Sequence, residues 1–408
     1  RESFRVPVSS HPRIAVCGVR YSANLGDGVI SDCLDWMISD VLPGAEVTHH
    51  DLAGRTGFGE ETISGRREKL RILLALPRTL QNAIVRLLLG RKINRDLLPH
   101  WKGRIAGCDG CLIGGGQLLS DADLNFPLKI DGLIRSLDEA NLPAAIYACG
   151  VTCGGGQGAR ILARCLSNRQ IKAVYLRDHK SMQAVAGFGI HDPVHAYDPA
   201  IHVADAYRCN EDREQSDAFD VGINFTDPVN MAYSSGRDLP YVGRLGETLA
   251  TVVTTLSSRG LKVALFTNGA VEDEQFLDQS DALAGLSKLG NVTRLKRPIE
   301  PNELVRSIHR MRSVIAHRLH TNIISFALKI PSIGLEWSQK VPHFFELVGR
   351  GEFVVHKDDL TAATILKRFD AMADVPVDSQ RLAEMKQDSL STLRDALTRL
   401  GIAVESHG

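Results

Sequence analysis

Residues 313–328 read Ser-Val-Ile-Ala-His-Arg-Leu-His-Thr-Asn-Ile-Ile-Ser-Phe-Ala-Leu, and this stretch decides the fold class. Its first four residues form a short apolar run of the kind found in buried strands. From Thr321 onward the apolar residues recur with the spacing of a helix. The stretch is therefore one β–loop–α unit, and two histidines and an arginine occupy its turn.

Similar units follow one another along most of the chain. We expect a first series of strands at Arg13–Val19, Gly110–Gly114, Ala145–Cys149, Ala173–Leu176 and His195–Tyr197. We expect a second series at Asp220–Asn224, Lys262–Thr267, Val292–Leu295, Ser313–Ala316 and Pro331–Leu335. Apolar strands that alternate with helices are typical of doubly wound parallel sheets. The sequence predicts an α/β protein with two Rossmann-like domains facing a cleft.

A polar stretch marks the boundary between these two series. Residues 208–217 have the composition of a linker, so we place an N-terminal Rossmann-like domain at residues 1–207 and a C-terminal one at 208–378. Residues 379–408 form a separate C-terminal helix and tail. The helix is expected from Ser379 to Leu400 because apolar residues recur on one of its faces. A length of 408 residues is also more than one core usually holds.

Composition and charge limit the classes of function. The chain is 44% hydrophobic and 24% charged, which is typical of a folded globular protein. Its 48 basic residues balance 48 acidic ones, so we expect no nucleic-acid partner. The apolar runs are shorter than the roughly 20 residues that span a bilayer, and no signal peptide is visible. We therefore expect a cytoplasmic protein whose scattered cysteines, including Cys108 and Cys111, are structural thiols.

The loops after the strands are where ligands bind in such folds. The loop after the first strand contains Asn24 and Asp27 but lacks the dinucleotide fingerprint, and a plain Asn/Gly turn explains it equally well. Gly114-Gly115-Gly116-Gln117, followed by Asp121, allows close approach of a ligand. The loop at residues 150–158 is either a nest of amides at a helix start or a flexible connection.

Basic side chains follow three further strands. Arg177 has a guanidinium fork that suits a phosphate or a carboxylate, although an ion pair with Asp178 or Asp198 is equally open. Arg318 and His320 come just before a helix, whose dipole favours an anion. An imidazole also exchanges protons near neutral pH. Lys340 adds one more cation after the next strand. These residues predict an anion-binding site.

Six motifs, in this order, resemble the polysaccharide pyruvyl transferase family. They are Asn24-x-Gly26-Asp27, Gly114-Gly115-Gly116 with a following acid, Tyr147-x-x-Gly150, Arg177-Asp178-x-x-Ser181, Asp198-Pro199-Ala200, and Arg318-Leu319-His320 with Ile330-Pro331 and Lys340 after it. The resemblance implies a glycosyltransferase-B-like fold. It also implies transfer of pyruvate from phosphoenolpyruvate to a sugar of a polysaccharide or a lipid-linked precursor, with formation of a cyclic ketal and release of phosphate. His317 and Cys153 depart from the family pattern.

The resemblance also assigns roles to residues. The donor-binding residues would be Arg177, Arg318, His320, Leu319, Lys340, Gly115 and Gly116. The acceptor-binding residues would be Asn24, Asp27 and Gln117. His320 and Asp121 would be the acid and the base, in an order left open, with Arg318 as a further catalytic residue and His317 in a supporting part. Phosphoenolpyruvate is a co-substrate, and we expect neither a cofactor nor a metal.

Two other interpretations stay open. One is a nucleotide-sugar-dependent glycosyltransferase of the same fold, with Glu336 as the acid that binds ribose. The other is a non-catalytic carbohydrate-binding paralogue, against which Asp121, Arg177, Arg318 and His320 argue together.

Residues 66–95 are poorly covered by the resemblance. They contain nine Lys and Arg and one acid, interleaved with leucines and isoleucines. Basic amphipathic helices of this kind lie on anionic membranes. Peripheral docking at the inner face of the membrane is one interpretation, and a helix that packs on the domain with a solvated basic face is the other.

Overall fold

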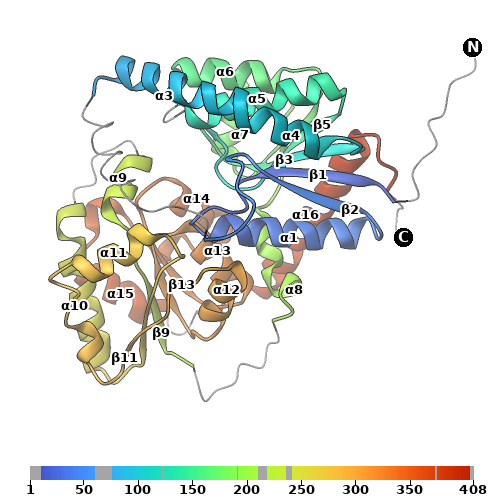
Figure 1. Ribbon diagram of the computed structural model, residues 1–408. Coiled ribbons are helices and arrows are strands. Elements are labelled where there is room, and N and C mark those ends of the chain that lie inside the picture. The colour runs from blue at the N-terminus through green and yellow to red at the C-terminus, as the bar shows by residue number, and fades with distance from the viewer. Residues whose placement is uncertain are drawn as a thin grey trace, which may run out of the picture.

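The computed structural model describes residues 11–59, 76–121, 124–190, 192–209, 218–235, 241–372 and 375–404. Two six-stranded parallel sheets form its centre (Figure 1). The N-terminal sheet has the order β2-β1-β3-β5-β7-β8. Its strands are β1 Arg13–Gly18, β2 Glu46–Asp51, β3 Gly110–Gly114, β5 Ala144–Cys149, β7 Ile171–Leu176 and β8 Val194–His195. A small parallel pair, β4 Leu119–Ser120 and β6 Val151–Thr152, lies beyond it.

The C-terminal sheet has the order β11-β10-β9-β12-β13-β14. Its strands are β9 Val221–Asn224, β10 Val263–Phe266, β11 Val292–Arg294, β12 Val314–Ala316, β13 Ser332–Leu335 and β14 Val354–Val355. In both sheets the strand order reverses beside the first strand, between β1 and β3 and between β9 and β12. Ligands of open α/β sheets bind at such switch points, outside the carboxyl ends of the strands.

Helices cover both sheets (Figure 1). The N-terminal part contains α1 Gly26–Val41, α3 Arg78–Lys92, the π-helical turn η1 Ile93–Leu97, α4 Leu98–Ile105, α5 Asn125–Ala140, α6 Gln157–Leu166 and α7 His179–Ala186. The short η2 Pro199–His202 and α8 Val203–Ala206 lead toward the second part. That part contains α9 Pro228–Ser235, η4 Val242–Arg244, α10 Leu245–Ser258, α11 Val271–Gln279, η5 Leu286–Lys288, α12 Pro301–His309, α13 Leu319–Ala327, α14 Lys340–Leu347, η6 Gly351–Phe353, η7 Lys357–Asp359 and α15 Ala362–Met372.

The last helix, α16 Ser379–Arg399, returns to the N-terminal sheet. Tyr147 of β5 donates a hydrogen bond to the Ser389 carbonyl (3.1 Å), and Tyr175 of β7 donates to Asp395 (2.6 Å). Leu393 and Leu397 are fully buried in the same cluster as the β1 residues Ile14 and Val16. The chain therefore crosses between the two parts a second time. The domain limits at residues 207/208 and 378/379 stay a prediction, since residues 210–217 lie outside the described ranges.

All ten expected strands are present, with bounds that differ from the expected ones by at most two residues. β8 ends at His195 rather than Tyr197. α1 begins at Gly26, so Asp27 belongs to its first turn and Leu25 is the N-cap residue. α13 begins at Leu319, so His320 is a helical residue and not part of a loop. β2 was missed, because Glu46-Val47-Thr48-His49-His50-Asp51 is too polar to be recognised as a strand.

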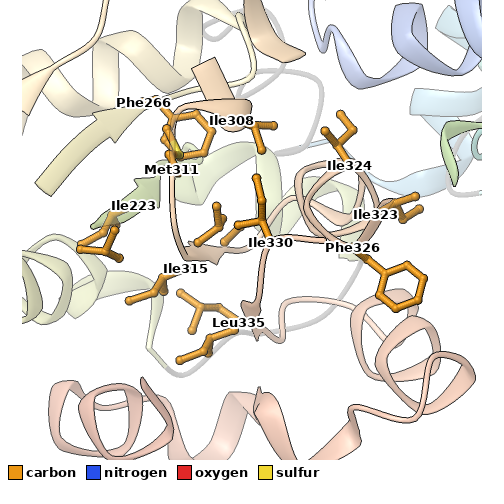
Figure 2. Packing of buried hydrophobic residues seen from close by; sticks show 14 of the residues in the cluster. Ile223, Phe266, Ile308, Met311, Ile315, Ile323, Ile324, Phe326, Ile330 and Leu335 are labelled. Atoms are coloured by element: carbon orange, nitrogen blue, oxygen red, sulfur yellow. The ribbon is translucent and has the colours of Figure 1, made fainter. Parts of the chain in front are cut away.

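The core of the C-terminal part holds α13 in place. Ile223, Ile315 and Leu335 of the sheet belong to the same buried hydrophobic cluster as Ile323, Ile324 and Phe326 of α13 (Figure 2). All residues of α13 from His320 to Ala327 are buried. A fully buried side chain of this size contributes about 1.5–3 kcal/mol to folding. The helix also contacts α1 and η2 of the N-terminal part, so it lies where the two parts of the molecule meet.

Candidate functional site

His320 lies where the two parts of the molecule meet. Its Nδ1 is 3.8 Å from Oδ1 of Asp27, in the first turn of α1, and its Nε2 is 3.9 Å from Oδ2 of Asp198, just before η2. A Cβ added to Gly26 would lie 2.5 Å from the imidazole, so α1 can approach the ring closely only because a glycine stands there. The imidazole is therefore fixed between two carboxylates.

Burial determines the protonation state of this imidazole. It lowers the pKa of His320 below the ordinary histidine value, and the charges of Asp198 and Asp27 oppose that shift in part. Among the described residues, Nε2 is buried without a hydrogen-bond partner. A neutral imidazole with one open nitrogen can accept a proton, and the adjacent carboxylates stabilise the imidazolium that results.

Arg177 follows β7 and faces the same carboxylate from the other side. Its Nη1 donates to Asp198 (3.3 Å) and its Nη2 to Oε1 of Gln117 (2.9 Å). The guanidinium passes directly over Gly150, where an added Cβ would lie 2.9 Å from both Nε and Nη2. Gln117 in turn donates to Thr152 Oγ1 (2.6 Å). Arg177 is therefore both an ion-pair partner and a wall of the crevice.

The triple-glycine loop after β3 brings backbone close to α1. Gly115 and Gly116 have φ values of +82° and +75°, which residues with a side chain rarely adopt. A Cβ on Gly116 would lie 3.3 Å from Oδ1 of Asp27, so this loop approaches the carboxylate that faces His320. Asp121 lies further along, where its Oδ1 accepts from the Gly154 amide (2.8 Å). It holds the loop between β6 and α6.

Arg318 is the N-cap residue of α13 and binds a buried acid. Its Nη2 donates to Oδ2 of Asp273 (2.5 Å), which is fully buried in α11. Burial raises the pKa of Asp273 even though the charge of Arg318 opposes that shift. The buried Nε of Arg318 has no partner among the described residues. A guanidinium carries five N–H donors, so Arg318 can bind an anion in addition to Asp273.

Asn24 joins the two parts through a buried amide network. Asn268 donates to Oδ1 of Asn24 (3.4 Å), and its own side-chain oxygen accepts from Asn224 (2.9 Å) and from Thr321 of α13 (2.7 Å). The Leu25 amide also donates to the Asn268 carbonyl (3.0 Å). Asn24 therefore helps to fix α1 against the strand ends of the C-terminal sheet.

A pocket of about 560 Å³ opens beside Arg177 and Asp198. The N-terminal ends of three helices reach its wall, with His179 and Lys180 of α7, Leu319 of α13 and Lys340 of α14. Positive helix ends and basic side chains favour an anionic ligand. Arg381 and Met385 of α16 and Phe344 of α14 also line the pocket.

Lys340 is the cation of this pocket with the most perturbed pKa. Its ammonium lies 5.8 Å from the centre of the Trp337 ring. Burial, followed by repulsion from Arg177, lowers the pKa of Lys340 to about 7. A bound anion would favour the charged form, so the affinity of the pocket for an anion should depend on pH near neutrality.

His317 does not face the crevice. It is fully buried, its ring stacks on Tyr241 with 6.0 Å between the ring centres, and its carbonyl accepts from Trp337 (2.8 Å). Burial, and then the charge of Arg318, lower its pKa to about 3. Neither ring nitrogen has a partner among the described residues. His317 supports the turn that carries Arg318.

Sequence reasoning named Asp198 only as a possible ion-pair partner of Arg177, which the structure confirms, and gave no role to Asp273 or Asn268. Asp198 was part of a recognised motif, and its place after a strand was the available signal. Asp273 and Asn268 carry no such signal. In the described ranges, no group of three or more His, Cys, Asp or Glu side chains is arranged to hold a metal. All eight cysteines are free thiols, and Cys111 lies 3.5 Å from Cys17.

Comparison with known proteins identifies the chain's relatives. The sequence profile of the polysaccharide pyruvyl transferase family matches residues 24–339, which is most of the chain. A comparison with curated proteins yields no match.

Three solved structures of similar fold have low sequence identity to this chain. The UDP-GlcNAc 2-epimerase of Methanocaldococcus jannaschii is 10% identical, with a TM-score of 0.59 and coverage of 95% of this chain and 99% of that one. The UDP-N-acetylglucosamine 2-epimerase of Rickettsia bellii is 10% identical (TM-score 0.55, coverage 96% and 97%). The α,α-trehalose 6-phosphate synthase of Burkholderia multivorans is 14% identical (TM-score 0.52, coverage 95% and 96%). The expected glycosyltransferase-B-like fold is confirmed.

Proposed function

Because the chain belongs to the polysaccharide pyruvyl transferase family, we propose that it transfers pyruvate from phosphoenolpyruvate to a sugar of a polysaccharide or its lipid-linked precursor. The product is a cyclic ketal across two hydroxyls of one sugar, and phosphate is released. One observation carries the proposal. Arg177 and Lys340, from opposite sheets, line one pocket, and the buried His320 faces Asp198 on its wall.

The donor is a compact anion with a phosphate and a carboxylate. Such a ligand needs at least two cationic or amide-rich binding points. Arg177 and Lys340 supply two, the start of α13 at Leu319 supplies a positive helix end, and Arg318 retains donors beyond its bond to Asp273. Gly115 and Gly116 would offer backbone amides to the donor, since their lack of side chains lets this loop lie close to Ile30 and Asp27 of α1.

The acceptor lies on the N-terminal side in this proposal. Asn24, Asp27 and Gln117 would bind its hydroxyls, and Asp27 lies within 3.8 Å of the His320 ring. His320 accepts the proton of the attacking hydroxyl, since burial lowers its pKa and keeps it neutral at pH 7. Asp198 and Asp27 then stabilise the imidazolium. Asp121 is then the candidate acid that protonates the methylene carbon of the donor, and its Oδ1 accepts from the Gly154 amide (2.8 Å).

The reaction balances without an oxidant or a reductant. The methylene carbon of phosphoenolpyruvate gains a proton and becomes a methyl group, while a sugar hydroxyl bonds to the adjacent carbon. The second hydroxyl bonds to the same carbon as the bond to the phosphate oxygen breaks. One of the two hydroxyl protons replaces the proton used at the methylene carbon, and the other leaves with the phosphate or enters solvent. No step uses a cofactor.

The nucleotide-sugar alternative has less support at the site. Glu336, its candidate acid, accepts from Gln339 (2.6 Å) and lies 2.7 Å from His356 Nδ1, so both carboxylate oxygens are engaged. One solved neighbour was determined in complex with UDP-GlcNAc and UDP, but its 11% identity supports the fold alone.

One assay tests the proposal. The protein is incubated with phosphoenolpyruvate and glycosides of galactose or mannose, or with lipid-linked oligosaccharides. We expect phosphate release together with a mass gain of the acceptor equal to pyruvate minus water. Release of a nucleoside diphosphate from a nucleotide sugar would instead establish a glycosyltransferase. Donor turnover without acceptor modification, across the acceptor panel, would contradict the ketal product.

A further inference from the structure

Helix α3 has an unusual composition. Its fifteen residues, Arg78–Lys92, include Arg78, Arg86, Arg91 and Lys92 and no Asp or Glu. Three of the five large apolar side chains exposed in the described residues belong to it: Leu80 (47%), Leu87 (54%) and Leu88 (61%). A soluble helix normally presents its polar face to water. The outward face of α3 is instead apolar and basic.

Helix α3 also has a face that packs on the protein. Val85 and Leu89 point inward and pack on the core of the N-terminal part, and Ile93 and Leu97 of η1 anchor the helix end by complete burial. At about 100° per residue, Leu87 falls within about 20° of Leu80 around the helix. Arg91 falls about 20° from Leu80 on the side of Leu88, and Arg86 and Lys92 fall about 120° away on opposite sides. An exposed apolar stripe that contains one cation and has others at its edges is the arrangement of a helix that lies in a lipid headgroup layer.

We propose that α3 is a docking surface for an anionic lipid bilayer. Leu80, Leu87 and Leu88 enter the boundary between headgroups and acyl chains, and Arg86, Arg91 and Lys92 pair with lipid phosphates. Charge complementarity favours this occupant over a second copy of the chain. A symmetric contact through α3 would bring Arg86, Arg91 and Lys92 against the same three cations of the other copy, because such an interface pairs each patch with itself.

The position of α3 connects this surface with the crevice. A hollow beside α3 is lined by its residues Arg86, Leu87 and Arg91 and by Gln157, the first residue of α6. The segment that ends at Gln157 begins at Gly150, and the Arg177 guanidinium lies directly against Gly150. Figure 1 shows α3 and α6 together on the outer layer of the N-terminal part. A chain docked through α3 therefore brings the loop beside Arg177 toward lipid-borne molecules. No described helix is itself long and apolar enough to cross a membrane.

Co-sedimentation of the full chain with vesicles tests the proposal. We expect binding to vesicles of phosphatidylglycerol with phosphatidylcholine, little binding to pure phosphatidylcholine, and weaker binding as salt rises. Arg86→Gln with Arg91→Gln should lower the affinity for these vesicles roughly 30-fold, since each Lys or Arg near an anionic surface contributes about 1 kcal/mol to the free energy of binding. Leu87→Gln with Leu88→Gln should lower it roughly tenfold or more.

Ile299→Gln is the matched control, because Ile299 is similarly exposed (45%) but lies in the C-terminal part. It should bind vesicles as the unchanged chain does. Absence of binding to anionic vesicles, or equal binding by all variants, would overturn the proposal. A dimer in sedimentation velocity that the Leu87 and Leu88 changes dissociate would assign the surface to a second copy instead. Pyruvyl transfer to a soluble acceptor should be unchanged in every α3 variant, so failure of docking is distinguishable from failure of the proposed function.

Discussion

The imidazole Nε2 of His320 lies 3.9 Å from the Asp198 carboxylate, so a helix of the C-terminal part meets a loop of the N-terminal part at one buried point. Asp198 also holds Arg177 at 3.3 Å. The carboxylate thus links the proposed base to a proposed donor-binding cation. Proton transfer and donor binding should therefore respond together to changes at this residue.

Asp198→Asn should move the acidic limb of the pH profile of kcat to lower pH. The Asp198 charge raises the pKa of His320 against the effect of burial, so removing that charge lowers it further. His320 then stays neutral in more acidic solution. Turnover at the optimum should fall about 10²-fold or more, because the imidazolium loses a stabilising charge. Steady-state kinetics from pH 5 to 9 measures both effects, with the exposed Asp358→Asn as control. If the acidic limb of the pH profile did not move, His320 would not be the base.

Gly150→Ala should weaken phosphoenolpyruvate binding. A methyl group there would lie 2.5 Å from Gln117 Oε1 and 2.9 Å from the Arg177 guanidinium, which must then move. KM for the donor should rise roughly tenfold or more, because even a small displacement of the Arg177 guanidinium weakens its interaction with the donor. Gly156→Ala in the same loop has open space around its added methyl group and should keep the original KM. Equal kinetics for the two variants would place the donor away from Arg177.

Arg318→Ala should destabilise the fold as well as reduce activity. The Asp273 carboxylate is fully buried and would lose its ion-pair partner. Breaking a buried pair by removing one partner costs about 3–5 kcal/mol. The double variant Arg318→Ala with Asp273→Asn should regain much of the free energy of unfolding, measured in urea, without regaining activity. A single variant as stable as the unchanged chain would contradict the importance of this pair for the fold.

The sequence predicts where the strands lie better than it predicts which strands pair with one another. Apolar runs predict ten of the strand positions, but the polar β2 is stabilised by pairing with β1, which no local pattern reveals. The start of α13 was placed too late because Arg318 offers no capping side chain as a signal. The site depends on residues far apart in the chain. Spacing indicates that Arg177 and His320 follow strands, but only the folded chain places Asp198 between them.

His317 should make the protein less stable in acid. Its pKa falls from about 6.5 in the unfolded chain to about 3 in the folded one because the ring is buried. As the pH drops below 6.5, the unfolded state gains a proton that the folded state cannot bind, so stability is lost between pH 6.5 and 3. The loss is about 1.4 kcal/mol per pH unit. His317→Leu should flatten this part of the dependence in urea unfolding at pH 7 and pH 5. An unchanged slope would show that the ring is charged or solvated in the fold.

Lys340 should make phosphoenolpyruvate binding depend on pH. Burial and the neighbouring Arg177 lower the pKa of the free ammonium to about 7, so it is charged below pH 7 and increasingly neutral above it. KM for phosphoenolpyruvate should rise with pH through this range, while kcat at saturating donor changes less. Lys340→Arg keeps its charge at every accessible pH, and its KM should be nearly constant from pH 6 to 8.5. Lys340→Met should show a high KM throughout. If the arginine and methionine variants shared the pH dependence of the unchanged chain, the titrating group would be another residue and Lys340 would not bind the donor.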